Sequence, residues 1–222
     1  VFFWPAYVFA ASAGICYYFS EYNAVILFVF GLICLVASVI GQVLITKDEF
    51  SAVPYCVIPY AYPLLSLCAL YILYYGLEPR YALTACSLAI LAPQAADVMA
   101  YFGGTLFGKH KLCPSISPKK TVEGSAFSLL GGVLMALILY AIQSVWGGEV
   151  QLWPMLSLGL LCGIIGQFGD LIASCIKRAA GIKDFSSVLP GHGGFMDRID
   201  SVVLCAPMVL AFFMILSYFS VK

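Results

Sequence analysis

The chain has 222 residues, of which 63% are hydrophobic and 10% are charged, and its mean hydropathy is +1.00. Soluble domains are about half apolar and about a quarter charged, so this composition excludes an ordinary soluble globule. Disorder is excluded as well, because disordered chains combine low hydrophobicity with high net charge. Eleven basic residues balance eleven acidic ones, so no overall field attracts nucleic acid. We expect an integral membrane protein.

Seven apolar stretches are long enough to cross a bilayer, which takes about 20 residues of helix. They cover residues 3–20, 24–45, 53–75, 81–107, 125–146, 152–175 and 201–221. The third contains three prolines, so we expect a kinked or broken helix there. None shows the alternation of a membrane β-barrel. The predicted fold is therefore all-α, a polytopic integral membrane bundle of about seven transmembrane helices.

We divide the chain into N-terminal transmembrane helices, residues 1–80, and a second bundle, residues 81–222, which carries the polar loops 108–124 and 174–200. The chain starts abruptly in an apolar run without a basic segment or cleavage site, so we expect further helices upstream of Val1 rather than a signal peptide. The nine cysteines include no CxxC pair, and we interpret them as small buried hydrophobes.

The distribution of charge predicts the orientation of the chain. Nine of the eleven basic residues lie in alternate loops, residues 46–52, 108–124 and 174–200. The opposite side keeps only Arg80 and Lys222. By the positive-inside rule, the two long loops then face the cytoplasm.

Several glycines fall where helices are expected to pack. Residues 103–109 spell GxxxxGK, most of a nucleotide-binding P-loop. The next residue is His110 instead of Ser or Thr, and the segment follows an apolar helix rather than a strand, so we reject a P-loop. We interpret its glycines as small residues that let membrane helices approach closely. The pair Gly131–Gly132 suggests a homodimer contact for the same reason.

Asp97 is an ionisable residue deep in an expected membrane helix. It precedes Gly108 by eleven residues, which is about 16 Å of helix. A carboxylate at that depth costs several kcal/mol unless it is paired or hydrated, and such residues usually mark a functional cavity. We interpret Asp97 as functional, and a structural ion pair is the alternative.

Two polar stripes flank a Gly-rich turn in the second long loop. The first stripe has the spacing i, i+4, i+7 and i+8 and consists of Asp170, Ser174, Lys177 and Arg178. The second begins the last helix with Asp197 and Asp200. The turn between them, residues 190–194, can close main-chain N–H groups on an anion. A solvated loop face is the alternative for either stripe alone.

The residue types in these segments suit phosphate chemistry. Carboxylates hold hard divalent cations, and Lys, Arg and N–H groups bind phosphates. Catalysis by a Ser-His-Asp triad is poorly supported, because no GxSxG motif is present and the only loop histidines are His110 and His192. The sequence therefore predicts a phosphate-handling metal site at the cytoplasmic face of a helical bundle.

The motif that begins at Ser174 resembles the signature of the phosphatidate cytidylyltransferase family, the CDP-diacylglycerol synthases. It reads S-x-x-K-R, four residues, K-D, and then P-x-H-G-G-x-x-D-R-x-D, which ends at Asp200. The upstream strings D-x-x-A-Y-x-x-G from Asp97 and S-P-K-K-T-x-E-G from Ser117 are similar to that family too. Members usually have further helices before the first one found here.

The resemblance implies a magnesium-dependent nucleotidyltransferase that converts CTP and phosphatidic acid to CDP-diacylglycerol and pyrophosphate in phospholipid biosynthesis. It implies Asp170 and Asp197 as the metal ligands, with a second cation left open. The other expected catalytic residues are Lys177, Arg178, His192 and Arg198. The expected substrate-binding residues are Asp97, Ser117, Lys119, Lys120, Thr121, Glu123, Ser174, Lys183, Asp184 and Asp200.

Location and partners follow from this chemistry. We expect an integral protein of a bacterial inner membrane, with the active site on the cytoplasmic side, no nucleic-acid partner and a homodimer. The alternatives are a CTP-dependent enzyme that acts on another membrane lipid, such as a diether lipid phosphate or a polyprenol, and an ion-coupled transporter.

Overall fold

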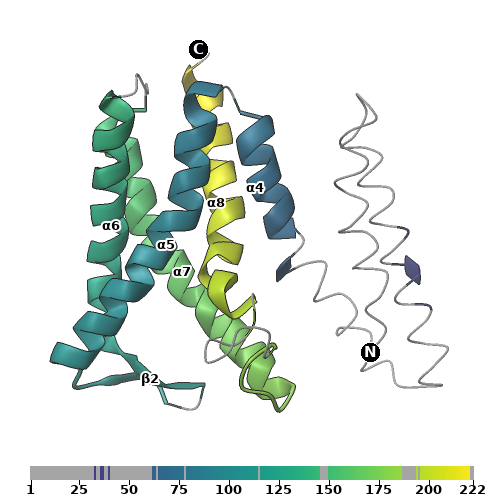
Figure 1. The fold of residues 1–222 in the computed structure, drawn as a ribbon, viewed down its shortest axis with the longest axis vertical. Helices are drawn as coiled ribbons and strands as arrows, with labels where there is room; N and C mark the ends of the chain where they lie inside the picture. Colours follow the sequence, from purple (N-terminus) through teal and green to yellow (C-terminus); the bar gives the residue numbers. More distant parts are fainter. Residues whose placement is uncertain are drawn as a thin grey trace. The chain divides into compact units, whose positions relative to one another are not determined.

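The computed structural model describes residues 62–63, 65–77, 79–114, 116–145, 150–186, 194 and 196–220, together with 33, 36–37 and 40. The chain forms two compact units, Val1–Leu65 and Ser66–Lys222. The site lies in the second unit, and the fold is described for that unit. Its helices, drawn in Figure 1, are α4 (Leu65–Tyr75, which starts at the unit boundary), α5 (Pro79–Phe107), α6 (Val122–Val145), α7 (Leu152–Ala179) and α8 (Met196–Ser220).

Four of the described helices are long and apolar enough to cross a membrane: Tyr81–Phe107, Val122–Val145, Leu152–Ala179 and Met196–Leu216. They confirm the spans expected at 81–107, 125–146, 152–175 and 201–221. The expected span 3–20 lies outside the described residues, and 24–45 lies almost entirely outside them. Of 53–75, the structure describes an α-helix only from Leu65 to Tyr75. The count of about seven helices and the division at residue 80 stay predictions.

The second polar loop is shorter than the sequence suggested. Helix α7 continues to Ala179, and α8 already begins at Met196. Gly181 ends α7 with a φ of 69°, and the N–H groups of Gly181 and Ile182 donate to the carbonyl oxygens of Arg178 and Lys177. This is a Schellman motif, which favours glycine at the left-handed position. Lys177 and Arg178 therefore belong to the last turn of a helix.

The first polar loop contains a small antiparallel sheet. Strands β1 (Lys111–Cys113) and β2 (Ser117–Thr121) pair with Lys111 opposite Thr121 and Cys113 opposite Ser117. The N–H of Val122 also donates to the carbonyl oxygen of His110, at 3.0 Å. The sequence predicted only a loop here. Figure 1 places this hairpin at the end of the bundle where α7 ends and α8 begins.

Helix α5 packs against α6, α7 and α8. The side chains between the helices are small or medium apolar residues, including Leu88, Ala92, Ala136, Met155, Leu158, Cys162, Cys205 and Val209. The outward face of α6 instead exposes Leu130, Leu134, Leu137 and Ile138. Since lipid chains are as apolar as these side chains, an exposed leucine face is typical of a helix in a bilayer.

Glycines bring α6 into close contact with its neighbours. A Cβ on Gly131 would lie 2.7 Å from the carbonyl oxygen of Ala95 in α5, and one on Gly132 would lie 3.1 Å from the backbone nitrogen of Gly163 in α7. Both glycines are buried within this chain. The prediction that these two glycines form a homodimer contact was therefore wrong, because helices α5 and α7 of the same chain already cover them.

The six cysteines in the described part of the chain are free thiols. Cys162 and Cys205 are buried as expected, whereas Cys68 and Cys175 are exposed. Nothing at these positions suggests a disulfide framework.

Candidate active site

Three helices bring together an acidic cluster, which consists of Asp97 of α5, Asp170 of α7 and Asp200 of α8. The side chain of Asp97 is hydrogen-bonded to Ser201, and its charge interacts with that of Asp170. The charge of Asp200 interacts with those of Asp170 and Asp97. The sequence placed these carboxylates in separate segments, and the packing of α5, α7 and α8 joins them. Like charges so gathered disfavour the ionised form of each carboxyl group unless a cation lies nearby.

Lys120 of β2 supplies one such cation. Its Nζ lies 2.7 Å from Oδ2 of Asp170, and it also donates to the carbonyl oxygen of Gln167 at 3.3 Å. The side chains of Lys120 and Asp170 are 21% and 30% exposed. The hairpin thus carries a predicted substrate-binding lysine onto a predicted metal ligand.

Gln167 of α7 and Ser125 of α6 form hydrogen bonds beside the Lys120–Asp170 ion pair. The sequence motifs did not point to these two residues. Ser125 Oγ donates to Oε1 of Gln167 at 2.5 Å. The Nε2 of Gln167 donates to the carbonyl oxygens of Gly163 and Ser125, at 2.8 and 3.4 Å. The signal was an amide within an apolar helix, three residues before Asp170.

A second ion pair joins α7 to α8. Lys177 Nζ lies 2.8 Å from Oδ1 of Asp197, and the two side chains are 11% and 8% exposed. Oδ2 of Asp197 accepts the N–H groups of Phe185 and Gly194, both at 2.9 Å. Lys177 also lies 5.3 Å from the centroid of the Phe185 ring. Asp197 therefore fixes both ends of the segment between the two helices.

Two residues expected to bind substrate have structural contacts instead. Thr121 is 7% exposed, and its Oγ1 accepts the N–H of Gly124 at 3.1 Å, which caps the N-terminus of α6. Glu123 Oε2 accepts the N–H groups of Lys109 and His110, at 3.0 and 3.2 Å. Its Oε1 lies 2.7 Å from Nδ1 of His110.

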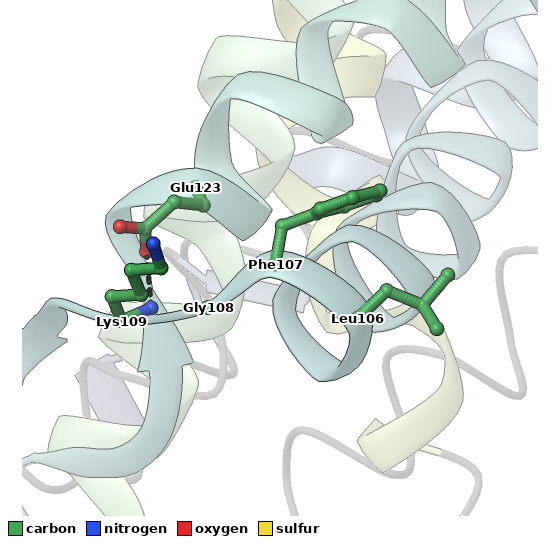
Figure 2. A pocket seen from close by; sticks show the side chains of 5 residues that line it. All are labelled: Leu106, Phe107, Gly108, Lys109 and Glu123. Carbon is green, nitrogen blue, oxygen red and sulfur yellow. Dashed lines mark hydrogen bonds between the residues drawn. The ribbon is translucent and has the colours of Figure 1, made fainter.

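Figure 2 shows a pocket of about 490 Å³ beside this Glu123 contact. Leu106, Phe107 and Gly108 at the end of α5 line it together with Lys109 and Glu123. Leu106 and Phe107 are 72% and 55% exposed. Apolar side chains next to a lysine are typical of a membrane–water interface.

The remaining predicted site residues are placed as follows. Ser174 is buried on α7, and Arg178, exposed on the same helix, donates to the carbonyl oxygen of Ile182 at 3.4 Å. Ser117 is half-buried, and the exposed residues are Lys119, Lys183, Asp184 and Arg198. His192 lies outside the described residues.

The donor set suits a hard cation such as Mg²⁺. Among the described residues, no three carboxylate, imidazole or thiol side chains are arranged to hold a metal ion by themselves. Magnesium does not need such a group, because one or two carboxylates, water and substrate phosphates usually complete its six oxygen ligands. Asp197 and the acidic cluster offer oxygen atoms only, so the residues fit this cation.

Comparisons with known proteins identify relatives of the chain. A family model described as "Cytidylyltransferase family" matches residues 1–216. The chain is 41% identical over 122 residues to a phosphatidate cytidylyltransferase of Staphylococcus saprophyticus, and these residues make up 54% of this chain and 45% of the relative. It is 33% identical over 181 residues to one of Staphylococcus epidermidis, covering 81% and 66%. It is 40% identical over 153 residues to one of Bacillus subtilis, covering 65% and 55%. The chain thus spans roughly half the length of the first of these relatives.

Proposed function

The chain belongs to the cytidylyltransferase family, and from this premise we propose that it transfers the cytidylyl group of CTP to phosphatidic acid. The products are CDP-diacylglycerol and pyrophosphate. The proposal is supported by the names of the relatives, which are phosphatidate cytidylyltransferases, by the apolar helices that suit a lipid substrate, and by the phosphate-type chemistry of the site.

In the proposed step, an oxygen of the lipid phosphate forms a bond to the α-phosphorus of CTP. The bond from that phosphorus to the bridging oxygen of the β-phosphate breaks, and pyrophosphate leaves. Because the attacking oxygen is already anionic, the step needs no strong general base. Its barrier comes from bringing two polyanions together, and positioned cations lower that barrier by electrostatic stabilisation.

The observation that carries the proposal is the pairing of carboxylates with lysines at one end of the bundle. Asp170 and Asp197 are the proposed ligands of Mg²⁺, with a second cation as an alternative. When bound, the metal would neutralise charge on the phosphates. Lys120 and Lys177 lie beside these carboxylates and would bind phosphate oxygens that approach the metal.

The other predicted polar residues are given supporting roles in this proposal. Asp97 and Asp200 of the acidic cluster would act as further ligands or as contacts to the nucleotide. Further phosphate contacts are assigned to Ser117, Lys119, Ser174, Arg178, Lys183, Asp184, His192 and Arg198. For Thr121 and Glu123, the hydrogen bonds favour a positioning role, since they hold the start of α6 and the end of α5.

We place the site on the cytoplasmic side of a bacterial inner membrane. The support is the concentration of basic residues in the segment that connects α5 to α6 and around the end of α7 and the start of α8. That side gives access to a water-soluble nucleotide and to a lipid headgroup at once. A homodimer is also proposed, although not through Gly131 and Gly132.

Label transfer tests the reaction directly. The purified protein in nanodiscs is incubated with phosphatidic acid, Mg²⁺ and CTP labelled at either the α- or the γ-phosphorus. We expect the α-label in the lipid extract and the γ-label in pyrophosphate. A γ-label in the lipid would show a kinase. Label in the lipid only when another lipid phosphate replaces phosphatidic acid would show a different acceptor, and transport without nucleotide consumption would show a transporter.

A further inference from the structure

Each of the two proposed metal ligands is paired with a lysine from another part of the chain. Lys120 of β2 reaches Asp170 of α7, and Lys177 of α7 reaches Asp197 of α8, at 2.7 and 2.8 Å. A lysine is a compact positive charge on a flexible stem with four carbons. Such a side chain can neutralise a carboxylate in one state and bind a phosphate in another.

The surroundings of the lysines suit such a change of partner. Besides pairing with Asp170, Lys120 donates a long hydrogen bond to the carbonyl oxygen of Gln167. Its side chain is 21% exposed, so it already reaches solvent. The ring of Phe185 lies beside Lys177 and provides a surface for its cation while it moves.

Asp170 and Asp197 are stabilised as carboxylates by a cation, both before and after a nucleotide binds. Asp197 is nearly buried, and Asp170 interacts with the charges of Asp97 and Asp200. An unneutralised carboxylate in such surroundings is costly. A metal that enters with a nucleotide would satisfy these carboxylates and also bring phosphates that attract the released lysines.

We propose that Lys120 and Lys177 are internal counter-ions that occupy Asp170 and Asp197 until a metal–nucleotide complex binds, and that they then transfer to its phosphates. This inference rests on the proposed function. It means that each lysine competes with the metal in the absence of nucleotide and assists the nucleotide when the metal is present.

The two effects of one lysine therefore have opposite signs. Replacing Lys120 with glutamine removes the cation that competes with the metal for Asp170. Every molecule can then bind the metal without first breaking an ion pair, so affinity for the metal alone should rise by about 5-fold. The same change removes a phosphate contact, so affinity for CTP in the presence of metal should fall. A lysine with a purely structural role would lower both.

Lys120 is the better position to test, because it is less buried than Lys177. Mn²⁺ alone is titrated into the purified protein in nanodiscs, and free Mn²⁺ is followed by electron paramagnetic resonance. The variants are Lys120→Gln, Lys120→Arg, which keeps the charge, and Lys111→Gln as a matched control. Lys111 is exposed on the partner strand of the same hairpin, so its loss reports any general effect of charge.

We expect tighter Mn²⁺ binding only in Lys120→Gln, together with a CTP dissociation constant raised about 10-fold in the presence of Mn²⁺. Equal Mn²⁺ affinity in all four proteins would overturn the proposal, as would tighter binding in Lys111→Gln by the same factor. Because the titration needs no turnover, it remains informative if phosphatidic acid is not the acceptor. If the α-label reaches the lipid but Lys120→Gln does not change Mn²⁺ affinity, the proposed reaction is supported and the counter-ion role is refuted.

Discussion

Replacing Asp197 with asparagine removes the charge that neutralises Lys177 between α7 and α8. Both side chains are close to fully buried, at 8% and 11% exposed. Removing one partner of a buried ion pair costs about 3 to 5 kcal/mol, because the other charge is left uncompensated. The amide oxygen of asparagine can still accept the N–H groups of Phe185 and Gly194. We therefore expect the free energy of unfolding to fall by about 3 kcal/mol, the lower end of that range.

A double-mutant cycle with Lys177→Met separates the ion pair from other effects. Methionine removes the buried cation and keeps most of the side-chain volume. The double variant should be less destabilised than the sum of the two single variants, by about 2 kcal/mol. Unfolding in mixed micelles, followed by circular dichroism, gives the four free energies. If the two substitutions add to within about 0.5 kcal/mol, the pair contributes no coupling, and the reasoning from its burial fails.

The other predictions concern the packing around the site. Thr121→Val removes the cap of α6 and should cost about 1 kcal/mol of unfolding free energy, whereas Thr121→Ser should not; equal losses would disprove the capping role. Gly132→Ala places a methyl group against the backbone of α7 and should cost about 1 to 3 kcal/mol. Leu134→Ala on the exposed face of α6 is its control, and a comparable loss there would argue against a special close approach at Gly132.

The four apolar helices of the described part of the chain could be predicted from the sequence, because length and apolar composition alone decide which segments can span a bilayer. The residues at which the helices end were harder to predict. Asp170, Ser174 and Lys177 lie on one helix as the spacing predicted, yet α7 continues past them to Ala179, and the left-handed Gly181 that follows ends it. Gly181 is the sequence signal for this helix end, because glycine is favoured at the left-handed position that follows a helix.

The partners of the charged residues could not be predicted from spacing. Lys120 and Gln167 are 47 residues apart in the chain, and only the packing of the hairpin against α7 brings them together. The hairpin was missed because β2 begins Ser-Pro-Lys-Lys, a poor match to the residues that favour strands. The resemblance implied substrate binding for Thr121, and the structure shows that its hydroxyl also caps a helix.

The most direct test of the whole account is the turnover of Asp170→Asn in the label-transfer assay. Asp170 is 30% exposed and touches Lys120 from the hairpin, so asparagine should leave the melting temperature nearly unchanged. If this carboxylate holds the metal that carries the phosphates, kcat should fall by at least about 100-fold, while Lys111→Gln keeps the rate of the unmodified protein. A folded Asp170→Asn protein that forms labelled lipid at the unmodified rate at ordinary Mg²⁺ concentration would contradict the account.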